Sequence, residues 1–261
     1  MLLALDVGNT ETTVGLFTTD RLAGHWRLTT TLSRTPDEWA ALVSAYLTNA
    51  GYSPSGIKAA IVASVAPLVT QSLCEGVAAA TGVEPVQVDG HSQLPITLDV
   101  DEPLTVGADR IVNTLAAVRL FERDTIVVDF GTATTFDCIT ADGRFIGGVI
   151  MPGIRTAADE LVRRTAKLPA TELTAPDHVI GRRTEDCIRA GVVWGTVEAV
   201  DGLIRRIRDE WPTRGQDRPL VIATGGLATL IAPLTREIES VQPDLTLLGL
   251  RLAAEALGLG W

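Results

Sequence analysis

Lysine is nearly absent from this sequence of 261 residues, in which Lys58 and Lys167 are the only two. Neither follows a Gly-x-x-x-x-Gly run, so the sequence has no Walker A loop, whose lysine reaches the phosphates of a bound nucleotide. If the chain binds phosphate groups, backbone N–H groups, hydroxyl groups and metal ions must therefore hold them.

Cysteine and histidine are also sparse, with three residues of each. Cys74, Cys138 and Cys187 lie far apart and form no Cys-x-x-Cys pair, which argues against a disulfide framework and against a zinc site. The histidines are scattered in the same way. We therefore expect free thiols, as in a reducing cytoplasm, and no metal site built from these two residue types.

Long apolar runs and an excess of positive charge are missing as well. No apolar run approaches the roughly 20 residues that a membrane helix needs, and the first residues lack the basic region of a signal peptide. The net charge of −10 disfavours a general surface for nucleic acids or anionic membranes. We expect a soluble, cytoplasmic protein with no nucleic-acid or membrane partner.

The sequence opens with a pattern that predicts a β-hairpin over residues 2–16. An apolar strand leads to Asp6, a Gly8-Asn9 turn follows, and threonines begin a second strand. Gly8 permits a positive φ and a close backbone approach to a ligand, and the N–H and hydroxyl groups after it can converge on an anion. We expect this hairpin to hold phosphate, with Asp6 placed to bind hydrated Mg²⁺.

The same pattern returns over residues 125–137, where an apolar strand leads to Asp129, Gly131 and a strand rich in threonine. A single Asp-x-Gly turn is compatible with an ordinary hairpin that binds nothing. Two copies about half a chain apart favour two domains, over residues 1–121 and 122–261, that clamp a nucleotide in the cleft between them. Strands and helices alternate elsewhere, as in an α/β fold.

Several helices can be predicted from local patterns. Thr35 and Glu38 form a capping box around Pro36, and apolar residues then recur at helical spacing. Residues 67–81 and 184–211 also read as helices, and the latter contains Gly191 and Gly195. Because each glycine costs a helix about 1 kcal/mol, the pair indicates close packing with another helix, including one across a dimer interface.

Five sequence blocks resemble the type III pantothenate kinases, within the actin, hexokinase and Hsp70 superfamily of ATP-dependent phosphotransferases. They run in the family's order: residues 6–10 (DVGNT), 107–110 (GADR), 129–134 (DFGTAT), 147–153 (GGVIMPG) and 223–226 (ATGG). The resemblance implies two ribonuclease H-like domains, each a β-β-β-α-β-α-β-α unit, with the active site in the cleft. It also implies phosphorylation of the 4′-hydroxyl of pantothenate, the first step of coenzyme A synthesis.

The resemblance further implies which residues bind ATP and metal ions. The ATP contacts would be Asp6, Val7, Gly8, Asn9, Thr10, Glu11, Thr12, Thr13, Thr132, Gly225 and Gly226. Asp6 would hold Mg²⁺ through water, and Gly225 and Gly226 would lie against adenosine, although a plain strand-to-helix turn is the alternative for them. Asp129 matches the position that binds an activating K⁺ or NH₄⁺ ion, with a second Mg²⁺ ligand as the alternative.

The substrate site would be built around residues 107–110. The implied pantothenate contacts are Gly107, Ala108, Asp109, Arg110, Thr184 and Val100. Asp109 would be the general base, at a helix start whose exposed N–H groups lower a carboxylate's pKa, and a charge that merely balances the helix dipole is the alternative. Gly107 would leave room for substrate.

Three of these contacts have ordinary alternatives or depart from the family. Arg110 could form only a surface ion pair, and Thr184 could be only a helix N-cap. Val100 stands where many family members carry a tyrosine, so a hydroxyl group is missing from the implied pocket.

The function that we expect is that of an ATP-dependent pantothenate kinase, a homodimer that uses Mg²⁺ and K⁺ or NH₄⁺. One alternative is a regulatory or accessory protein of the same fold with little turnover. The other is a kinase for a different small hydroxyl or carboxylate substrate. Intact hairpins and Asp109 disfavour the first, and the block at residues 107–110 disfavours the second.

Overall fold

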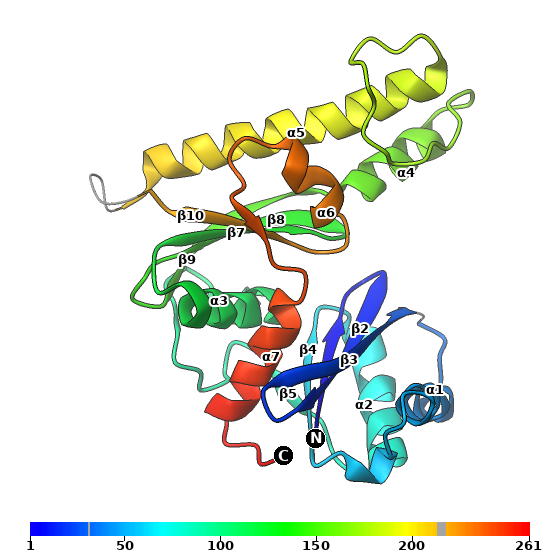
Figure 1. Ribbon diagram of the computed structural model, residues 1–261, viewed down its shortest axis with the longest axis vertical. Helices are drawn as coiled ribbons and strands as arrows, with labels where there is room; N and C mark the ends of the chain where they lie inside the picture. The colour runs from blue at the N-terminus through cyan, green and yellow to red at the C-terminus, as the bar shows by residue number, and fades with distance from the viewer. Residues whose placement is uncertain (31, 213–217) are drawn as a thin grey trace. The chain divides into compact units, whose positions relative to one another are not determined.

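The computed structural model describes residues 1–30, 32–212 and 218–261, and it divides into two compact units. Unit 1 comprises Met1–Leu120 and Asp244–Trp261, and unit 2 comprises Phe121–Pro243. Figure 1 shows the helices and strands of each unit with their labels.

Unit 1 contains a mixed β-sheet with the strand order β3-β2-β1-β4-β5. Its strands are β1 (Leu2–Val7), β2 (Glu11–Thr18), β3 (Arg21–Thr29), β4 (Ala59–Ser64) and β5 (Val86–Val88). The first three strands are antiparallel neighbours, whereas β4 runs parallel to β1 and β5 runs parallel to β4. The unit also contains the short strand β6 (Thr97–Leu98) and the 3₁₀ segments η1 (Pro54–Gly56) and η2 (Pro103–Thr105).

Side chains of a strand alternate between the two faces of its sheet. The apolar residues of β1 therefore lie on both faces, and helices cover each of them. Leu3 and Leu5 of β1 pack with helices α1 (Pro36–Asn49) and α2 (Pro67–Thr81). Leu2 and Ala4 pack with α3 (Ala108–Phe121) and α7 (Leu245–Ala256). The predicted capping box at the start of α1 is confirmed, since Thr35 and Glu38 each bond the other's backbone N–H.

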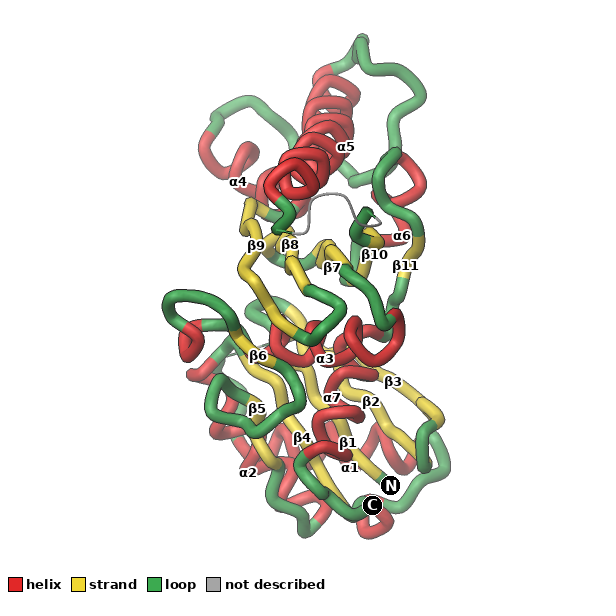
Figure 2. Tube along the Cα trace, turned by 90° about the vertical axis from the view of Figure 1, so that its left-hand side faces the viewer, coloured by secondary structure: helices red, strands yellow, loops and turns green. Residues whose placement is uncertain are grey.

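Unit 2 repeats this topology. Its strands are β7 (Thr125–Phe130), β8 (Ala133–Ile139), β9 (Arg144–Pro152), β10 (Leu220–Thr224) and β11 (Ser240–Val241), in the order β9-β8-β7-β10-β11. Its helical segments are α4 (Ile154–Arg164), α5 (Thr184–Glu210), α6 (Ala228–Ile231) and η3 (Ala232–Leu234). Val193, Val197 and Val200 of α5 pack with Phe130 and Phe136 in the unit's core. In Figure 2 both strand orders can be followed by their labels.

The duplicated α/β order predicted from the two hairpins is therefore confirmed, but the domain boundaries differ from the prediction at the C-terminus. Residues 244–261 belong to unit 1, although α7 follows β11 in the chain. The reason is its packing: Leu247 and Leu250 are buried in the core of unit 1, and a Cβ on Gly249 would lie 2.1 Å from the carbonyl oxygen of Val112. The glycine thus allows α7 to approach the backbone of α3 closely.

Candidate functional site

Hairpin 1, formed by β1, β2 and residues 8–10, turns where the sequence predicts, but Gly8 is not among the glycines that have a positive φ. The N–H of Gly8 donates to the carbonyl oxygen of Glu11 at 3.0 Å, and a Cβ on Gly8 would lie 2.9 Å from that oxygen. Position 8 therefore requires glycine. Asn9 and Thr10 are exposed at the tip, and Asp6 is half-buried near the end of β1.

The threonines after the turn point in different directions. Thr12 is fully buried, and its Oγ1 lies 2.9 Å from Oγ1 of Thr30, so its hydroxyl faces into unit 1. Thr13, the next residue, is only partly buried. Glu11 is exposed, and its carboxylate lies 3.5 Å from Nε of Arg27. Only the backbone of Thr12 is thus available for the ATP contact predicted for this residue.

Hairpin 2, formed by β7, β8 and residues 131–132, is tied to the first turn of α4. The N–H of Gly131 donates to the carbonyl oxygen of Ala133 at 3.1 Å. The carbonyl oxygen of Thr132 accepts from the N–H of Gly153 at 3.1 Å and from Oγ1 of Thr156 at 2.6 Å. A Cβ on Gly153 would lie 2.4 Å from this oxygen, so only glycine permits the contact.

Asp129 and the glycine turn after β10 lie together. Asp129 pairs with Thr224 in the parallel register of β7 and β10, and Gly225 follows with a φ of +90°. A Cβ on Gly225 would lie 2.3 Å from Oδ1 of Asp129. These residues stand at the carboxyl ends of adjacent parallel strands, where ligands of α/β sheets commonly bind.

The block at residues 107–110 lies at the corresponding edge of the sheet in unit 1. A Cβ on Gly107 would lie 3.3 Å from Cγ1 of Val65, the residue that follows β4. The N–H of Val65 in turn donates to the carbonyl oxygen of Val7 at the end of β1, at 3.0 Å. The structure thus brings the start of α3 close to the end of β1, from which hairpin 1 extends.

Asp109 is half-buried in the first turn of α3, and its Oδ1 accepts from the N–H of Arg110 at 2.8 Å. Burial raises the pKa of its carboxyl group, and the bond to the Arg110 N–H and the positive charge of Arg110 offset only part of this effect. The expectation of a lowered pKa was wrong because the sequence does not reveal desolvation. A raised pKa makes the carboxylate a stronger base at neutral pH.

Gly107 also affects the side chain of Asp109, in addition to its predicted role beside the substrate. A Cβ at this position would lie 2.5 Å from Oδ1 of Asp109, so the glycine leaves room for that carboxylate. Ala108 is buried, and Arg110 is half-buried in the same turn. Val100 is half-buried in the segment between β6 and η2.

Thr184 lies in unit 2, at the start of α5, and is exposed. It is the first helical residue and not the N-cap, because Arg183 holds that position without a side-chain bond. The alternative interpretation of Thr184 as an N-cap was therefore wrong. Its side chain lines a pocket of about 550 Å³ between the end of β9, α4 and α5.

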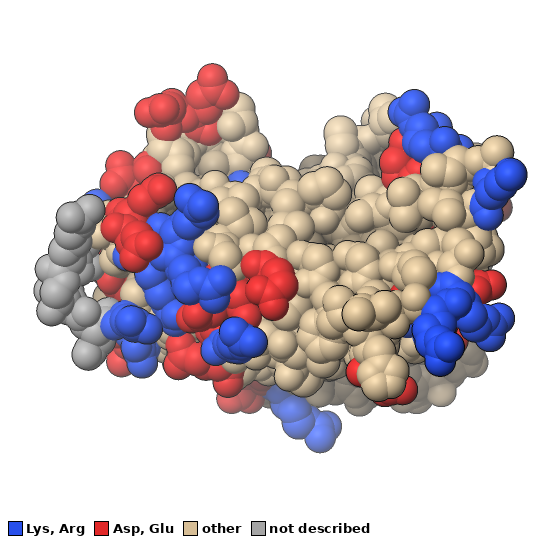
Figure 3. All heavy atoms as spheres, turned by 90° about the horizontal axis from the view of Figure 1, so that it is seen from above, with Lys and Arg blue, Asp and Glu red and all other residues tan. Residues whose placement is uncertain are grey.

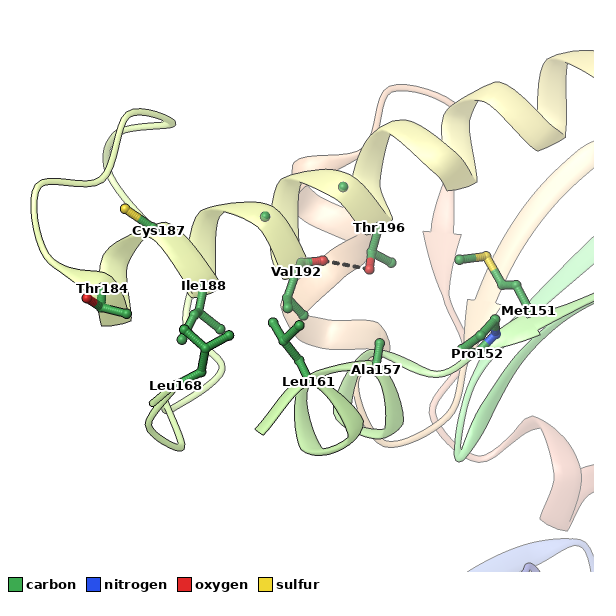
Figure 4. Close-up of a pocket in the computed structure, with 12 residues that line it drawn as sticks. Met151, Pro152, Ala157, Leu161, Leu168, Thr184, Cys187, Ile188, Val192 and Thr196 are labelled. Carbon is green, nitrogen blue, oxygen red and sulfur yellow. Dashed lines mark hydrogen bonds between the residues drawn. The ribbon is translucent and has the colours of Figure 1, made fainter. Parts of the chain in front are cut away.

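This pocket is almost entirely apolar. Its lining residues are Met151, Pro152, Ala157, Leu161, Leu168, Thr184, Cys187, Ile188, Gly191, Val192, Gly195 and Thr196. Figure 4 shows Leu161 and Leu168 pointing toward Ile188 and Val192, while the hydroxyl of Thr196 donates to the carbonyl oxygen of Val192 at 2.7 Å. Without a charged side chain, the lining is poorly suited to hold the carboxylate of a small acid.

Gly191 and Gly195 of α5 face open space. Gly191 and Gly195 are exposed, and no atom of the described chain beyond the neighbouring helix backbone lies within 4 Å of the place that a Cβ would take. No described helix of this chain therefore compensates for their cost in helix stability.

Figure 3 shows one face of the molecule on which acidic and basic side chains gather toward the ends and uncharged residues occupy the middle.

Residues 1–30, 32–212 and 218–261 contain no group of three or more His, Cys, Asp or Glu side chains arranged to hold a metal ion. In the same ranges, no helix is both long and apolar enough to cross a membrane.

Two residues of this region, Thr30 and Thr156, were missed by the sequence analysis. Thr30 bonds hairpin 1, and Thr156 bonds hairpin 2 together with Gly153, the last residue of the block at residues 147–153. All three lie outside the implied ATP contacts. The signal in the sequence for Thr30 and Thr156 is their position after the third strand of each unit. Their contacts depend on how that strand pairs, which the sequence does not specify.

Comparisons with known proteins show the family of the chain. The family model described as type III pantothenate kinase matches residues 2–206. The chain is 46% identical over 257 residues to the type III pantothenate kinase of Thermomicrobium roseum, with 98% of each chain covered. It is also 46% identical over 252 residues to that of Syntrophotalea carbinolica, with 97% of each covered.

A solved structure is similar in fold alone. It is the activator of the 2-hydroxyisocaproyl-CoA dehydratase from Clostridium difficile with bound ADPNP. The likeness has a TM-score of 0.52 at 10% sequence identity and covers 99% of this chain and 93% of that one.

Proposed function

The chain belongs to the type III pantothenate kinase family, and from that premise we propose which of its residues carry out the reaction. It is an enzyme that phosphorylates pantothenate with ATP, at the 4′-hydroxyl, in the first step of coenzyme A synthesis. Its fold is the duplicated α/β fold of actin- and hexokinase-like ATPases.

We propose that Asp109 is the general base that accepts the proton of the 4′-hydroxyl group. The observation that carries this assignment is its half-buried carboxylate, which has a raised pKa and lies at the edge of the sheet from which hairpin 1 extends. In phosphoryl transfer the protein contributes mainly positioning and charge stabilisation, so a single well-placed base is sufficient for the hydroxyl proton. Ala108 and Arg110, in the same turn, would contact pantothenate, with Val100 and Thr184 as further contacts.

We propose that both hairpins bind ATP. In unit 1, the backbone of residues 6–13 would contact the β- and γ-phosphates. In unit 2, Thr132 would contact phosphate, and Gly225 and Gly226 would contact adenosine. Support comes from the exposed turns and from the placement of Asp6 and Asp129 at the carboxyl ends of central strands.

Two bound cations belong to the same proposal. Asp6 would hold hydrated Mg²⁺, whose charge would stabilise the transferring phosphoryl group. A single half-buried carboxylate fits this ion, because Mg²⁺ in nucleotide sites retains waters and takes its other oxygens from phosphate. Asp129 would hold K⁺ or NH₄⁺. Rates with K⁺ or NH₄⁺ should exceed the rate with Na⁺, and equal rates in all three salts would remove the assignment.

We further propose that the enzyme is a homodimer whose interface includes α5. Gly191 and Gly195 leave that face of the helix open, and the neighbouring pocket is apolar. A second copy packed on this face would cover both. Replacement of Gly191 by a large residue should shift the mass measured by sedimentation toward the monomer. An unchanged mass for this variant would count against α5 as the interface.

A cytoplasmic location is also part of the proposal. All three cysteines are free thiols, as proteins in a reducing compartment have them.

The experiment that tests the proposed substrate site is a substrate panel with purified protein. Turnover is measured with ATP, Mg²⁺ and K⁺ against pantothenate, hexoses and acetate, for the wild type and for Asp109→Asn. Rapid turnover of pantothenate alone, lost in the variant, is the expected result. Turnover of pantothenate that persists in the variant would leave the kinase activity intact and refute the role of Asp109.

A further inference from the structure

Thr30, the residue after β3, holds the turn of hairpin 1 through three hydrogen bonds. Its Oγ1 donates to the carbonyl oxygen of Gly8 at 2.8 Å and lies 2.9 Å from Oγ1 of Thr12. Its N–H donates to the carbonyl oxygen of Thr10 at 2.9 Å. One threonine therefore contacts both ends of the turn and the buried threonine beneath it.

The direction of these bonds follows from the number of protons available. A threonine hydroxyl has one proton, and a carbonyl oxygen can only accept. The proton of Thr30 is given to Gly8, so the proton between the two hydroxyls must come from Thr12. The chain of donation runs from the buried Thr12 to Thr30 and then to the Gly8 carbonyl.

The bond to Gly8 fixes the orientation of one peptide plane. In a planar trans peptide, the N–H points away from the carbonyl oxygen of the preceding residue. With the Gly8 carbonyl held toward Thr30, the N–H of Asn9 must point away from Thr30. Glycine tolerates many backbone conformations, so position 8 alone would not prevent this plane from rotating.

We propose that Thr30 is a positioning residue for ATP, which keeps the Gly8 carbonyl away from the phosphates so that the Asn9 N–H can donate to them. The inference rests on the proposed binding of phosphate by hairpin 1. If the peptide plane were reversed, a carbonyl oxygen would face the anionic phosphates and replace an attractive contact with a repulsive one.

The first variant is Thr30→Val, which keeps the shape and the backbone N–H but removes the hydroxyl. Its binding of a nonhydrolysable ATP analogue and of AMP is measured by calorimetry in the presence of Mg²⁺. Loss of one oriented hydrogen-bonding group should weaken binding of the ATP analogue about fivefold to tenfold. Binding of AMP, which lacks the β- and γ-phosphates, should change less than about twofold.

Three companion variants separate positioning from general damage to the fold. Thr30→Ser restores the hydroxyl and should restore affinity for the ATP analogue. Thr12→Val breaks the bond between the two hydroxyls but keeps the bond to Gly8, so it should cost less affinity than Thr30→Val. In Thr30→Val the buried hydroxyl of Thr12 has lost its acceptor, and the double variant Thr12→Val/Thr30→Val removes that hydroxyl. The double variant should therefore be more stable to heat than Thr30→Val, but its affinity for the ATP analogue should be no higher.

The ratio of the two dissociation constants decides the outcome. If Thr30→Val leaves the ratio of the dissociation constants for the ATP analogue and AMP unchanged, whether or not both rise, the role of Thr30 is refuted. Gly8→Ala, whose Cβ would lie 2.9 Å from the Glu11 carbonyl oxygen, distinguishes the two levels of the proposal. If Gly8→Ala lowers the preference for the analogue and Thr30→Val does not, only the inference about Thr30 fails. If neither variant changes the preference, hairpin 1 is not the phosphate site.

Discussion

The two hairpins share a plan but are held in place by different neighbours. In hairpin 1 the paired residues Val7 and Thr12 enclose residues 8–11, whereas in hairpin 2 Phe130 and Thr134 enclose residues 131–133, one residue fewer. In each case the residue immediately after the third strand donates its N–H to a carbonyl oxygen of the turn: Thr30 to Thr10, and Gly153 to Thr132. A threonine hydroxyl adds a second bond in both units.

The difference lies in where that hydroxyl comes from. Thr30 supplies it in unit 1 and is itself bonded to the buried Thr12, so hairpin 1 is fixed within its own sheet. Thr156 supplies it in unit 2 from the first turn of α4, a helix that packs against α5. The two units thus share the backbone bond, whereas the side-chain bond depends on the sheet in unit 1 and on a helix layer in unit 2.

The largest expected effect is that of Asp109→Asn, which removes the proposed base of unit 1 and leaves both hairpins unchanged. The amide keeps the size of the side chain but cannot accept the hydroxyl proton. A general base typically contributes about 10²- to 10⁴-fold, so kcat should fall within that range while calorimetry gives nearly the same affinity for pantothenate. A loss below about tenfold would mean that proton removal does not limit the reaction.

The next effect is expected from Gly225→Ala in unit 2. The new Cβ would lie 2.3 Å from Oδ1 of Asp129, and a φ of +90° strains any other residue. Thermal unfolding should give a loss of about 2 to 4 kcal/mol in the free energy of unfolding. The matched variant is Gly226→Ala, where the Cβ has open space and should change stability by less than about 1 kcal/mol. Equal losses in the two variants would refute the contact with Asp129.

A smaller effect is expected from Thr156→Val, the counterpart of Thr30→Val in hairpin 2. Thr156 is exposed, and the carbonyl oxygen of Thr132 keeps its bond to the N–H of Gly153. Affinity for a nonhydrolysable ATP analogue, measured by calorimetry, should fall about twofold to threefold, less than in Thr30→Val. If Thr156→Val lowers the affinity for the analogue more than Thr30→Val does, the bond from α4 contributes more to ATP binding than the bond within the sheet of unit 1.

Local patterns in the sequence predicted much of the fold because they record short-range chemistry. The helix predicted over residues 67–81 has the bounds of α2, and the predicted capping box of Thr35 and Glu38 begins α1. The assignment of α7 to unit 1 depends on which sheet buries its leucines, and repeat order alone cannot reveal this.

The candidate site also has features that local sequence patterns could not predict. The motifs identified Asp109 and Gly107, but the raised pKa and the room that Gly107 leaves for the carboxylate depend on tertiary burial. The inward direction of Thr12 could have been predicted, because it shares a face of β2 with Val14 and Leu16. Thr30 has no local signature of its role, since its partners lie 18 and 22 residues away in sequence.

The rate of a single turnover with pantothenate as a function of pH tests the central claim, that Asp109 in unit 1 is the base. Because burial raises the pKa of Asp109, the wild-type rate should decline toward acid pH with an apparent pKa above the ordinary aspartate value of about 3.9. The residual rate of Asp109→Asn should lack this decline. The same decline in the variant would contradict the account, because another group would then control the loss of activity.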